Sequence, residues 1–250
     1  MNFKDHFSGR SESYAAFRPA YPNALIDSIS RLPAMRRLAL DCGTGSGQAA
    51  VALAAHFERV IATDASEKQL EHAAVAPNVE YRRAPAEASG LAERSVDLVT
   101  AAQSLHWFDI DAFFRETRRI LTVSGAVAVW GYGDPVMDEP ALETTLREFN
   151  RGLLEPYWPA ERSILLAGYR TIDFPFEEIV MPALALEVHW TLPQLAGLLR
   201  TWSAVSRYAA EHGRDPVAGV EASLAKDWGS PDEARLVRWP LHVRAGRTRS

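Results

Sequence analysis

The sequence predicts an α/β fold with a doubly wound, mostly parallel sheet, and three observations lead to this prediction. Short apolar runs alternate with helical runs between residues 38 and 133. A glycine-rich turn follows the first apolar run. The 250 residues are 47% hydrophobic and 24% charged, which is ordinary for a globular protein. Strands that alternate with helices at this spacing form parallel sheets covered on both faces.

The core elements follow from hydrophobic periodicity and helix-start signals. Five strands are expected, at residues 37–41, 60–64, 79–83, 96–102 and 125–130. Helices are expected at residues 23–32, 48–57 and 109–121, and a further helix begins after Ser66. Ser66 and Gln69 have the spacing of a capping box, in which each side chain satisfies a free backbone amide.

The alternation stops after Gly133, where we expect a linker at 134–140 and a helix to 154. A second capping box, Thr191 with Gln194, begins a helix that carries four large residues on about one face: Leu195, Leu199, Trp202 and Tyr208. Two late strands are predicted, at residues 173–180 and 236–243. Pro240 lies in the second, and because proline cannot donate to a strand ladder we expect an edge or a bulge there.

These elements make one domain, residues 1–250. Its core comprises about 36–133 and the late strands at about 172–182 and 234–246, and a helical cap comprises 1–35, 134–171 and 190–228. We expect the cap to close over the site as a lid that excludes water.

Charge and composition exclude several classes of protein. Lys and Arg number 27 against 32 Asp and Glu, a net charge of −5 that argues against a nucleic-acid partner. Cys42 is the only cysteine, which excludes an internal disulfide. No signal peptide and no apolar run long enough to span a bilayer is present, so we expect a cytoplasmic protein without a membrane partner. We also expect no metal, and the sequence does not decide between monomer and dimer.

The glycine turn after the first strand is the most informative segment. Glycines allow a tight turn and close approach of a ligand, and such a turn at the carboxyl end of a strand is where open α/β sheets bind ligands. Residues 45–50 also match the dinucleotide pattern Gly-x-Gly-x-x-Ala, with Asp64 near the expected ribose acid. A nicotinamide-dependent oxidoreductase is therefore an alternative. Asp41, directly before the glycines, suits a ligand with an ammonium group better than a pyrophosphate.

The pattern Asp-x-Gly-x-Gly-x-Gly at 41–47 resembles the class I S-adenosylmethionine-dependent methyltransferases. Residues 14–22, 86–87 and 103–109 are similar to the type-11 family of these enzymes. Within that family the chain most resembles the branch that contains trans-aconitate methyltransferase, and residues 198–205 also fit it.

The resemblance implies a seven-stranded sheet and S-adenosylmethionine as cofactor, with S-adenosylhomocysteine as product. It assigns the methionine moiety to the glycine turn, the ribose hydroxyls to Asp64 and the adenine to Ala65 and Ala86–Glu87. The implied cofactor-binding residues are Tyr14, Arg18, Asp41, Gly43, Thr44, Gly45, Asp64, Ala65, Gln69, Ala86, Glu87, Gln103 and Ser104. Many relatives carry an aspartate where this chain has Pro85, so adenine recognition falls to the backbone or to Glu87.

The resemblance also implies a small-molecule acceptor, with a carboxylate as one candidate. His106 and Trp107 lie where the acceptor should approach the methyl group, and Trp202 is a further candidate contact. For each, a structural role is the alternative: His106 as a loop residue instead of a base or contact, and the tryptophans as packing. Arg18, Arg170 and Arg207 are candidate partners for an anionic acceptor. A relative that binds the cofactor without transferring a methyl group is a further alternative.

Overall fold

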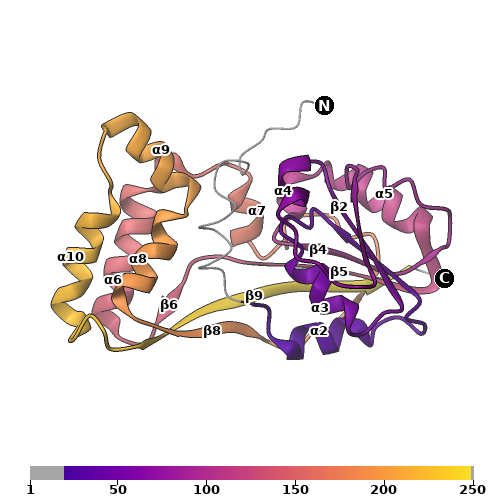
Figure 1. The fold of residues 1–250 in the computed structure, drawn as a ribbon, viewed down its shortest axis with the longest axis horizontal. Coiled ribbons are helices and arrows are strands. Elements are labelled where there is room, and N and C mark those ends of the chain that lie inside the picture. Colours follow the sequence, from indigo (N-terminus) through magenta and orange to yellow (C-terminus); the bar gives the residue numbers. More distant parts are fainter. Residues whose placement is uncertain (1–19, 249–250) are drawn as a thin grey trace.

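The computed structural model describes residues 20–248, and its core is a sheet with helices on both sides (Figure 1). The five core strands lie within three residues of their predicted starts and ends, apart from the start of the fifth. Their bounds are β1 Leu38–Cys42, β2 Arg59–Asp64, β3 Val79–Arg83, β4 Val96–Ala102 and β5 Leu121–Tyr132. The helices around them are α2 Asn23–Ser30, α3 Gln48–Ala54, α4 Glu67–Glu71, the short 3-10 segment η1 Leu105–Trp107 and α5 Ile110–Ile120.

The described sheet has nine strands. Seven of them, in the order β3-β2-β1-β4-β5-β9-β7, form the mostly parallel core that was predicted, and two further strands pair with the other half of β9. Strands β1 to β5 pair in parallel, and β9 (Arg235–Arg247) runs antiparallel to both β5 and β7 (Glu177–Ile179). The strand order reverses direction at β1, which lies between β2 and β4. A crevice at the carboxyl ends of the strands is expected at such a switch point, and this places the site.

Each face of the core sheet has its own hydrophobic cluster, because successive strand residues point to opposite faces. Ala39 of β1 packs on the side of α2 and α3, with Leu53 among its neighbours in the cluster. Leu40, the next residue, packs on the side of α5, in a cluster that includes Phe113 and Phe114. Figure 1 shows α5 on one side of the sheet and α2 and α3 on the other. Burial on both faces explains why these strands read as continuous apolar runs.

Strand β9 is longer than predicted and joins the core to the cap (Figure 1). Its residues 241–247 pair with β5, and its residues 235–240 pair with β8 (Ala185–Trp190). The two-residue strand β6 (Val136–Met137) pairs with the same half. The sequence analysis missed both β6 and β8. Pro240 lies where β9 changes from one set of neighbours to the other, which is a position that tolerates a missing donor.

The cap is a group of short helices that stands over β6, β8 and the first half of β9 (Figure 1). Its elements are α6 Pro140–Glu148, a π-helical turn η2 Phe149–Leu153, a 3-10 turn η3 Glu155–Tyr157, α7 Arg162–Leu166, α8 Leu192–Arg200, α9 Ser203–His212 and α10 Val217–Trp228. None of the described helices is long and apolar enough to span a bilayer.

The predicted helix after Thr191 is in fact two helices. Its capping box is confirmed, since Gln194 Oε1 accepts the backbone N–H of Thr191 at 2.9 Å. The helix ends at Arg200, and α9 begins only after Trp202, whose backbone is extended. The Thr201 hydroxyl donates to the Leu198 carbonyl at 2.6 Å. A threonine that bonds back to its own helix in this way competes with helix continuation.

The other predicted capping box, at Ser66, does not form. Ser66 makes no side-chain cap hydrogen bond to α4. Asp64 Oδ1 accepts the Ser66 backbone N–H at 2.8 Å, which is the donor that Gln69 would satisfy in a capping box. The Asp64 carboxylate therefore takes the place of the Gln69 side chain as the acceptor of this N–H.

Replacing Trp239 by alanine tests the role of β9 as the link between core and cap. Trp239 is 2% exposed and makes edge contacts with Tyr132 and Trp190, at centroid distances of 6.5 and 5.5 Å. We expect the free energy of unfolding to fall by about 3–5 kcal/mol, because a buried tryptophan leaves a large cavity. Urea unfolding measures it, with Val180→Ala, at an exposed site, as the matched control. A loss below about 1 kcal/mol would contradict this role.

Candidate functional site

The turn between β1 and α3 has three glycines in the left-handed region, and each has a different neighbour. The φ angles are +63° at Gly43, +56° at Gly45 and +82° at Gly47. A Cβ on Gly43 would lie 2.7 Å from Ser104 Cβ, and one on Gly47 would overlap the Tyr81 hydroxyl. A Cβ on Gly45 would meet nothing closer than Gln69 Oε1, at 3.8 Å. Gly43 and Gly47 therefore allow close protein packing, while Gly45 leaves an open face on the turn.

Asp41 lies beneath this turn with its side chain fully buried. One carboxylate oxygen accepts the Thr44 hydroxyl at 2.6 Å, and the other accepts the Thr100 hydroxyl at 2.8 Å. Burial raises the pKa of Asp41 to about 6, although the two hydroxyls oppose this effect. The carboxylate thus ties the turn to β4, and its contact with a cofactor stays a prediction.

Asp64, at the end of β2, organises the two loops beside it. Its Oδ2 accepts the backbone N–H of Gly45 at 2.9 Å, and its Oδ1 accepts that of Ser66. It is half-buried, as is the following Ala65. The predicted ribose acid therefore also accepts from the glycine turn. This contact is compatible with the predicted ribose contact because a carboxylate has about four acceptor sites.

The predicted adenine-side residues lie after β3. Ala86 is buried, and Pro85 before it is exposed. Glu87 Oε1 accepts the backbone N–H of Asp109 at 2.8 Å, and Asp109 in turn caps α5. Glu87 thus connects this loop to the start of α5, a connection that sequence reasoning did not predict.

The residues after β4 include one with a strained backbone, and polar contacts to neighbouring strands hold them in place. Gln103 has a φ of +56°, which is unfavourable for a side chain other than glycine. Its amide donates to the Tyr132 carbonyl at 3.0 Å and accepts the Tyr132 N–H at 2.8 Å. The Ser104 hydroxyl donates to the Cys42 carbonyl at 2.9 Å. These contacts fix the loop that leads to His106 against both β1 and β5.

His106 is 6% exposed and lies between aromatic rings. Its ring centroid is 4.8 Å from that of Trp107 and 6.3 Å from that of Tyr169. Its Nδ1 lies 3.3 Å from the Tyr169 hydroxyl. Burial lowers the pKa of His106 to about 4, with Glu161 opposing and Arg162 adding to the effect. His106 is therefore neutral at physiological pH.

Trp202, the third predicted substrate contact, packs within the cap. It stacks on Phe149 at a centroid distance of 6.4 Å and contacts Trp158 at 5.4 Å. This arrangement matches the packing alternative, and a direct substrate contact stays a prediction.

The structure brings the glycine turn, Asp64, Gln69, Gln103, Ser104 and the His106 loop to one edge of the sheet. Tyr14 and Arg18 lie outside the described residues. Arg170 and Arg207 are exposed, and Arg207 donates to the Tyr157 carbonyl at 3.1 Å. Sequence reasoning missed Tyr169, which follows α7 and belongs to no local motif.

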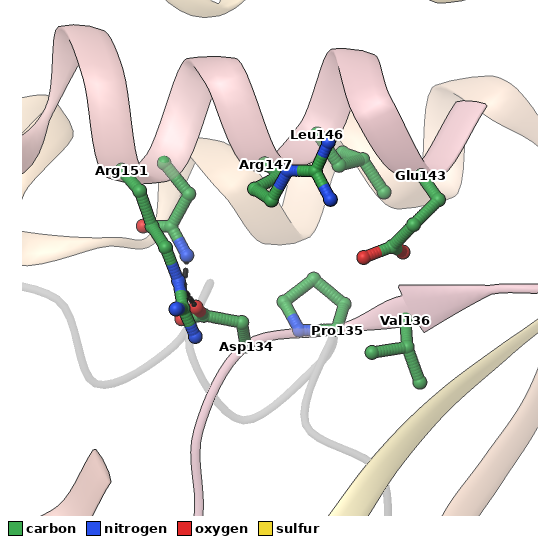
Figure 2. A pocket seen from close by; sticks show the side chains of 8 residues that line it. Asp134, Pro135, Val136, Glu143, Leu146, Arg147 and Arg151 are labelled. Carbon is green, nitrogen blue, oxygen red and sulfur yellow. Dashed lines mark hydrogen bonds and ion pairs between the residues drawn. The ribbon is translucent and has the colours of Figure 1, made fainter. Parts of the chain in front are cut away.

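A small cavity lies at the start of the cap, between the residues before β6 and helix α6 (Figure 2). Asp134 lies at one end of it and accepts from Asn150 at 2.5 Å, from Arg151 at 2.7 Å and from Arg162. Figure 2 shows Arg151 and Asp134 together on one side and Glu143 on the other. None of the predicted site residues lines this cavity. Its polar network joins η2 and α7 to the segment between β5 and β6.

The chain is similar in sequence to known methyltransferases. The family model described as "Methyltransferase domain" matches residues 40–129, which run from β1 to β5. A Dictyostelium discoideum protein named "Putative methyltransferase" is 33% identical over 247 residues, covering 96% of this chain and 94% of that one. A Saccharomyces cerevisiae protein named "Probable S-adenosylmethionine-dependent methyltransferase" is 30% identical over 50% of this chain and 46% of its own.

A solved structure shares the whole architecture, including the cap. The "Putative Type II Methyltransferase" of Anaeromyxobacter dehalogenans is 42% identical, with a TM-score of 0.87, over 92% of this chain and 98% of its own. Sequence and fold therefore agree over nearly the full length. The chain belongs to the class I S-adenosylmethionine-dependent methyltransferases.

Proposed function

We propose that this methyltransferase acts on a small molecule, and that the acceptor is a carboxylate, as in the trans-aconitate branch that the sequence resembles. The burial of His106 is the observation that most directly supports a small acceptor. The residue is 6% exposed, beneath Tyr169 and beside the half-buried Trp107. An acceptor that reaches this loop must fit a confined space, and this favours a metabolite over a nucleic acid.

The glycine turn fits S-adenosylmethionine. The open face of Gly45 allows close approach of a bulky ligand, and Gln69 borders it. The contacts of Asp64 with Gly45 and Ser66 are compatible with a bound ribose, because a carboxylate has about four acceptor sites. Ala65, Ala86 and Glu87 would lie on the adenine side, and Gln103, Ser104 and Thr44 on the methionine side. The cofactor, when bound, would supply a methyl group on a sulfonium. The acceptor oxygen would form a bond to the methyl carbon, and the electron pair of the broken C–S bond would leave with sulfur in S-adenosylhomocysteine.

The protein's own residues would position the acceptor against the methyl group and exclude water from the site. Holding two reactants at attack distance can supply several kcal/mol, up to about 7–11 kcal/mol. The strained Gln103 backbone and the Ser104 contact to β1 fix the His106 loop, so the acceptor would meet a rigid wall. The cap, through α7 and Tyr169, would close the site from the other side as a lid.

The function is tested by following S-adenosylhomocysteine formation with a panel of small acceptors. Matched sets of carboxylic acids, alcohols and amines are compared with duplex and single-stranded nucleic acid. We expect turnover with carboxylates, and mass spectrometry should locate the methyl group on oxygen. Turnover with nucleic acid, or with amines alone, would overturn the proposal.

Replacing Gly45 by alanine should weaken cofactor binding specifically. The new Cβ enters the open face of the turn, so we expect a loss of at least about 1.4 kcal/mol, which is tenfold in Kd. Gly213→Ala is the matched control, because Gly213 also has a positive φ, +67°, and meets nothing within 4 Å. Both substitutions place an alanine at a positive φ, which lowers the stability of each variant by about 1–2 kcal/mol. Calorimetric titration with S-adenosylhomocysteine should separate them, and equal affinities would remove Gly45 from the site.

The lowered pKa of His106 predicts a pH-dependent stability. The unfolded histidine, with a pKa near 6.5, binds a proton between pH 6.5 and 4, whereas the folded one, with a pKa of about 4, does not. Stability is therefore lost as the pH falls through this window, by about 2 kcal/mol from pH 7 to pH 5. The raised pKa of Asp41 acts in the opposite direction.

His106→Gln removes this contribution, since glutamine does not titrate. Relative to the wild type, the free energy of unfolding of the variant should therefore rise by about 2 kcal/mol as the pH falls from 7 to 5, because the opposing contribution of Asp41 remains. His72→Gln, at an exposed histidine, is the matched control and should keep the wild-type slope. Urea unfolding at several pH values gives the slopes, in which the Asp41 contribution is common to all three proteins. If His106→Gln and the wild type show the same slope, His106 is not buried as described.

A further inference from the structure

The Tyr169 hydroxyl is a buried polar group with a single partner. Tyr169 is 0% exposed, and its hydroxyl lies 3.3 Å from Nδ1 of His106. Among the residues that the structure describes, no other hydrogen-bond partner of this hydroxyl is present. Within residues 20–248, the imidazole of His106 is therefore the only polar contact of the phenol.

Tyr169 has a left-handed backbone conformation that two hydrogen bonds hold in place. Its φ is +58°, a left-handed conformation that costs about 1–3 kcal/mol outside glycine. Its backbone N–H donates to the Ile164 carbonyl at 3.0 Å, and its carbonyl accepts Arg244 Nη1 at 2.7 Å. Hydrogen bonds with α7 and with strand β9 thus stabilise the strained backbone of Tyr169.

Strand β5 makes room for the hydroxyl. A Cβ on Gly131 would lie 2.8 Å from the Tyr169 hydroxyl and 2.7 Å from Gln103 Oε1. A glycine inside a strand weakens it, and one reason for a glycine there is the close approach of another group. The absence of a side chain at Gly131 is what allows the hydroxyl to reach His106.

The position of the imidazole proton follows from this geometry. Burial raises the pKa of Tyr169, so the phenol keeps its proton. If His106 carried its proton on Nδ1, the phenol would have to accept it, and its own buried O–H would have no acceptor. An unsatisfied buried donor costs about 1–3 kcal/mol. The cost disappears when Tyr169 donates to an unprotonated Nδ1.

The second imidazole nitrogen has no partner in the described part of the chain. Nε2 of His106 makes no hydrogen bond with any residue between 20 and 248. Nε2 thus has no hydrogen-bond partner within these residues and can bond to a ligand that reaches it.

We propose that Tyr169 is a positioning residue that fixes His106 as the neutral tautomer protonated on Nε2, so that His106 offers the acceptor a hydrogen-bond donor and not a base. Resting on the proposed function, this specifies the acceptor as one whose oxygen is already ionised, such as a carboxylate. Methylation of such an oxygen forms the C–O bond, breaks the C–S bond and transfers no proton. An alcohol or ammonium acceptor would have to lose a proton that this tautomer cannot take.

The tautomer can be read directly from the ¹⁵N shifts of the histidine ring, with His106→Gln used to assign the signals. No acceptor or cofactor is needed. We expect one protonated and one unprotonated nitrogen, with the proton on Nε2 and unchanged between pH 5.5 and 8. The charged groups facing His106 in this range are Glu161 and Arg162. In Tyr169→Phe the two nitrogens should move toward each other in shift as the second tautomer becomes populated.

Tyr157→Phe is the matched control, because Tyr157 also contacts a histidine, His212, at 2.7 Å, but on the exposed surface of the cap. It should leave the His106 signals unchanged. Gly131→Ala is the second variant, which keeps the phenol but displaces its hydroxyl, and it should reproduce the effect of Tyr169→Phe.

A wild-type proton on Nδ1, or His106 shifts unaffected by both Tyr169→Phe and Gly131→Ala, would overturn the inference. Either result leaves the acceptor screen intact, because turnover of carboxylates does not depend on which nitrogen carries the proton in the free enzyme. Conversely, an Nε2 proton together with turnover of amines alone would retain the tautomer and reject the proposed acceptor.

Discussion

The carboxylate of Asp41, buried at the carboxyl end of β1, is the constraint that organises the site. A buried charge is costly unless hydrogen bonds compensate it. Here the compensation comes from two hydroxyls on different elements, Thr44 in the glycine turn and Thr100 on β4. The same two bonds therefore hold the turn against the strand pair at which the sheet order reverses. These bonds also hold Gly45 in place, because Gly45 directly follows Thr44 in the turn.

Carboxylates at this edge act on the backbone before any ligand arrives. Asp64 holds the N–H groups of Gly45 and Ser66, and Glu87 holds that of Asp109. Satisfying buried loop amides in this way makes the loops rigid, and preorganised groups cost no reorganisation during a reaction. These contacts are compatible with the proposed binding of ribose by Asp64, since a carboxylate has about four acceptor sites. The acids that the sequence assigns to recognition are thus also structural.

The sequence predicted the elements whose signal is local and missed those whose cause is distant. Strands such as β4 were predicted because burial on both faces leaves a continuous apolar run. The capping box at Ser66 was wrong because Asp64, two residues earlier, competes for the same amide. Strand β8 was missed because it forms only against the extended half of β9. Tyr169 was missed for the same kind of reason, since its partner is 63 residues away in the chain.

The long strand β9 explains how such distant residues come to share one site. Its Arg244 lies where β9 pairs with β5, donates to the Tyr169 carbonyl at 2.7 Å and pairs with Glu178 of β7. The guanidinium also stacks on Phe174, 4.5 Å from the ring centroid. Tyr169 is thereby fixed to the core sheet, although it follows α7 of the cap. The contacts of Tyr169 with Arg244 and with His106 therefore connect strand β9 to the imidazole.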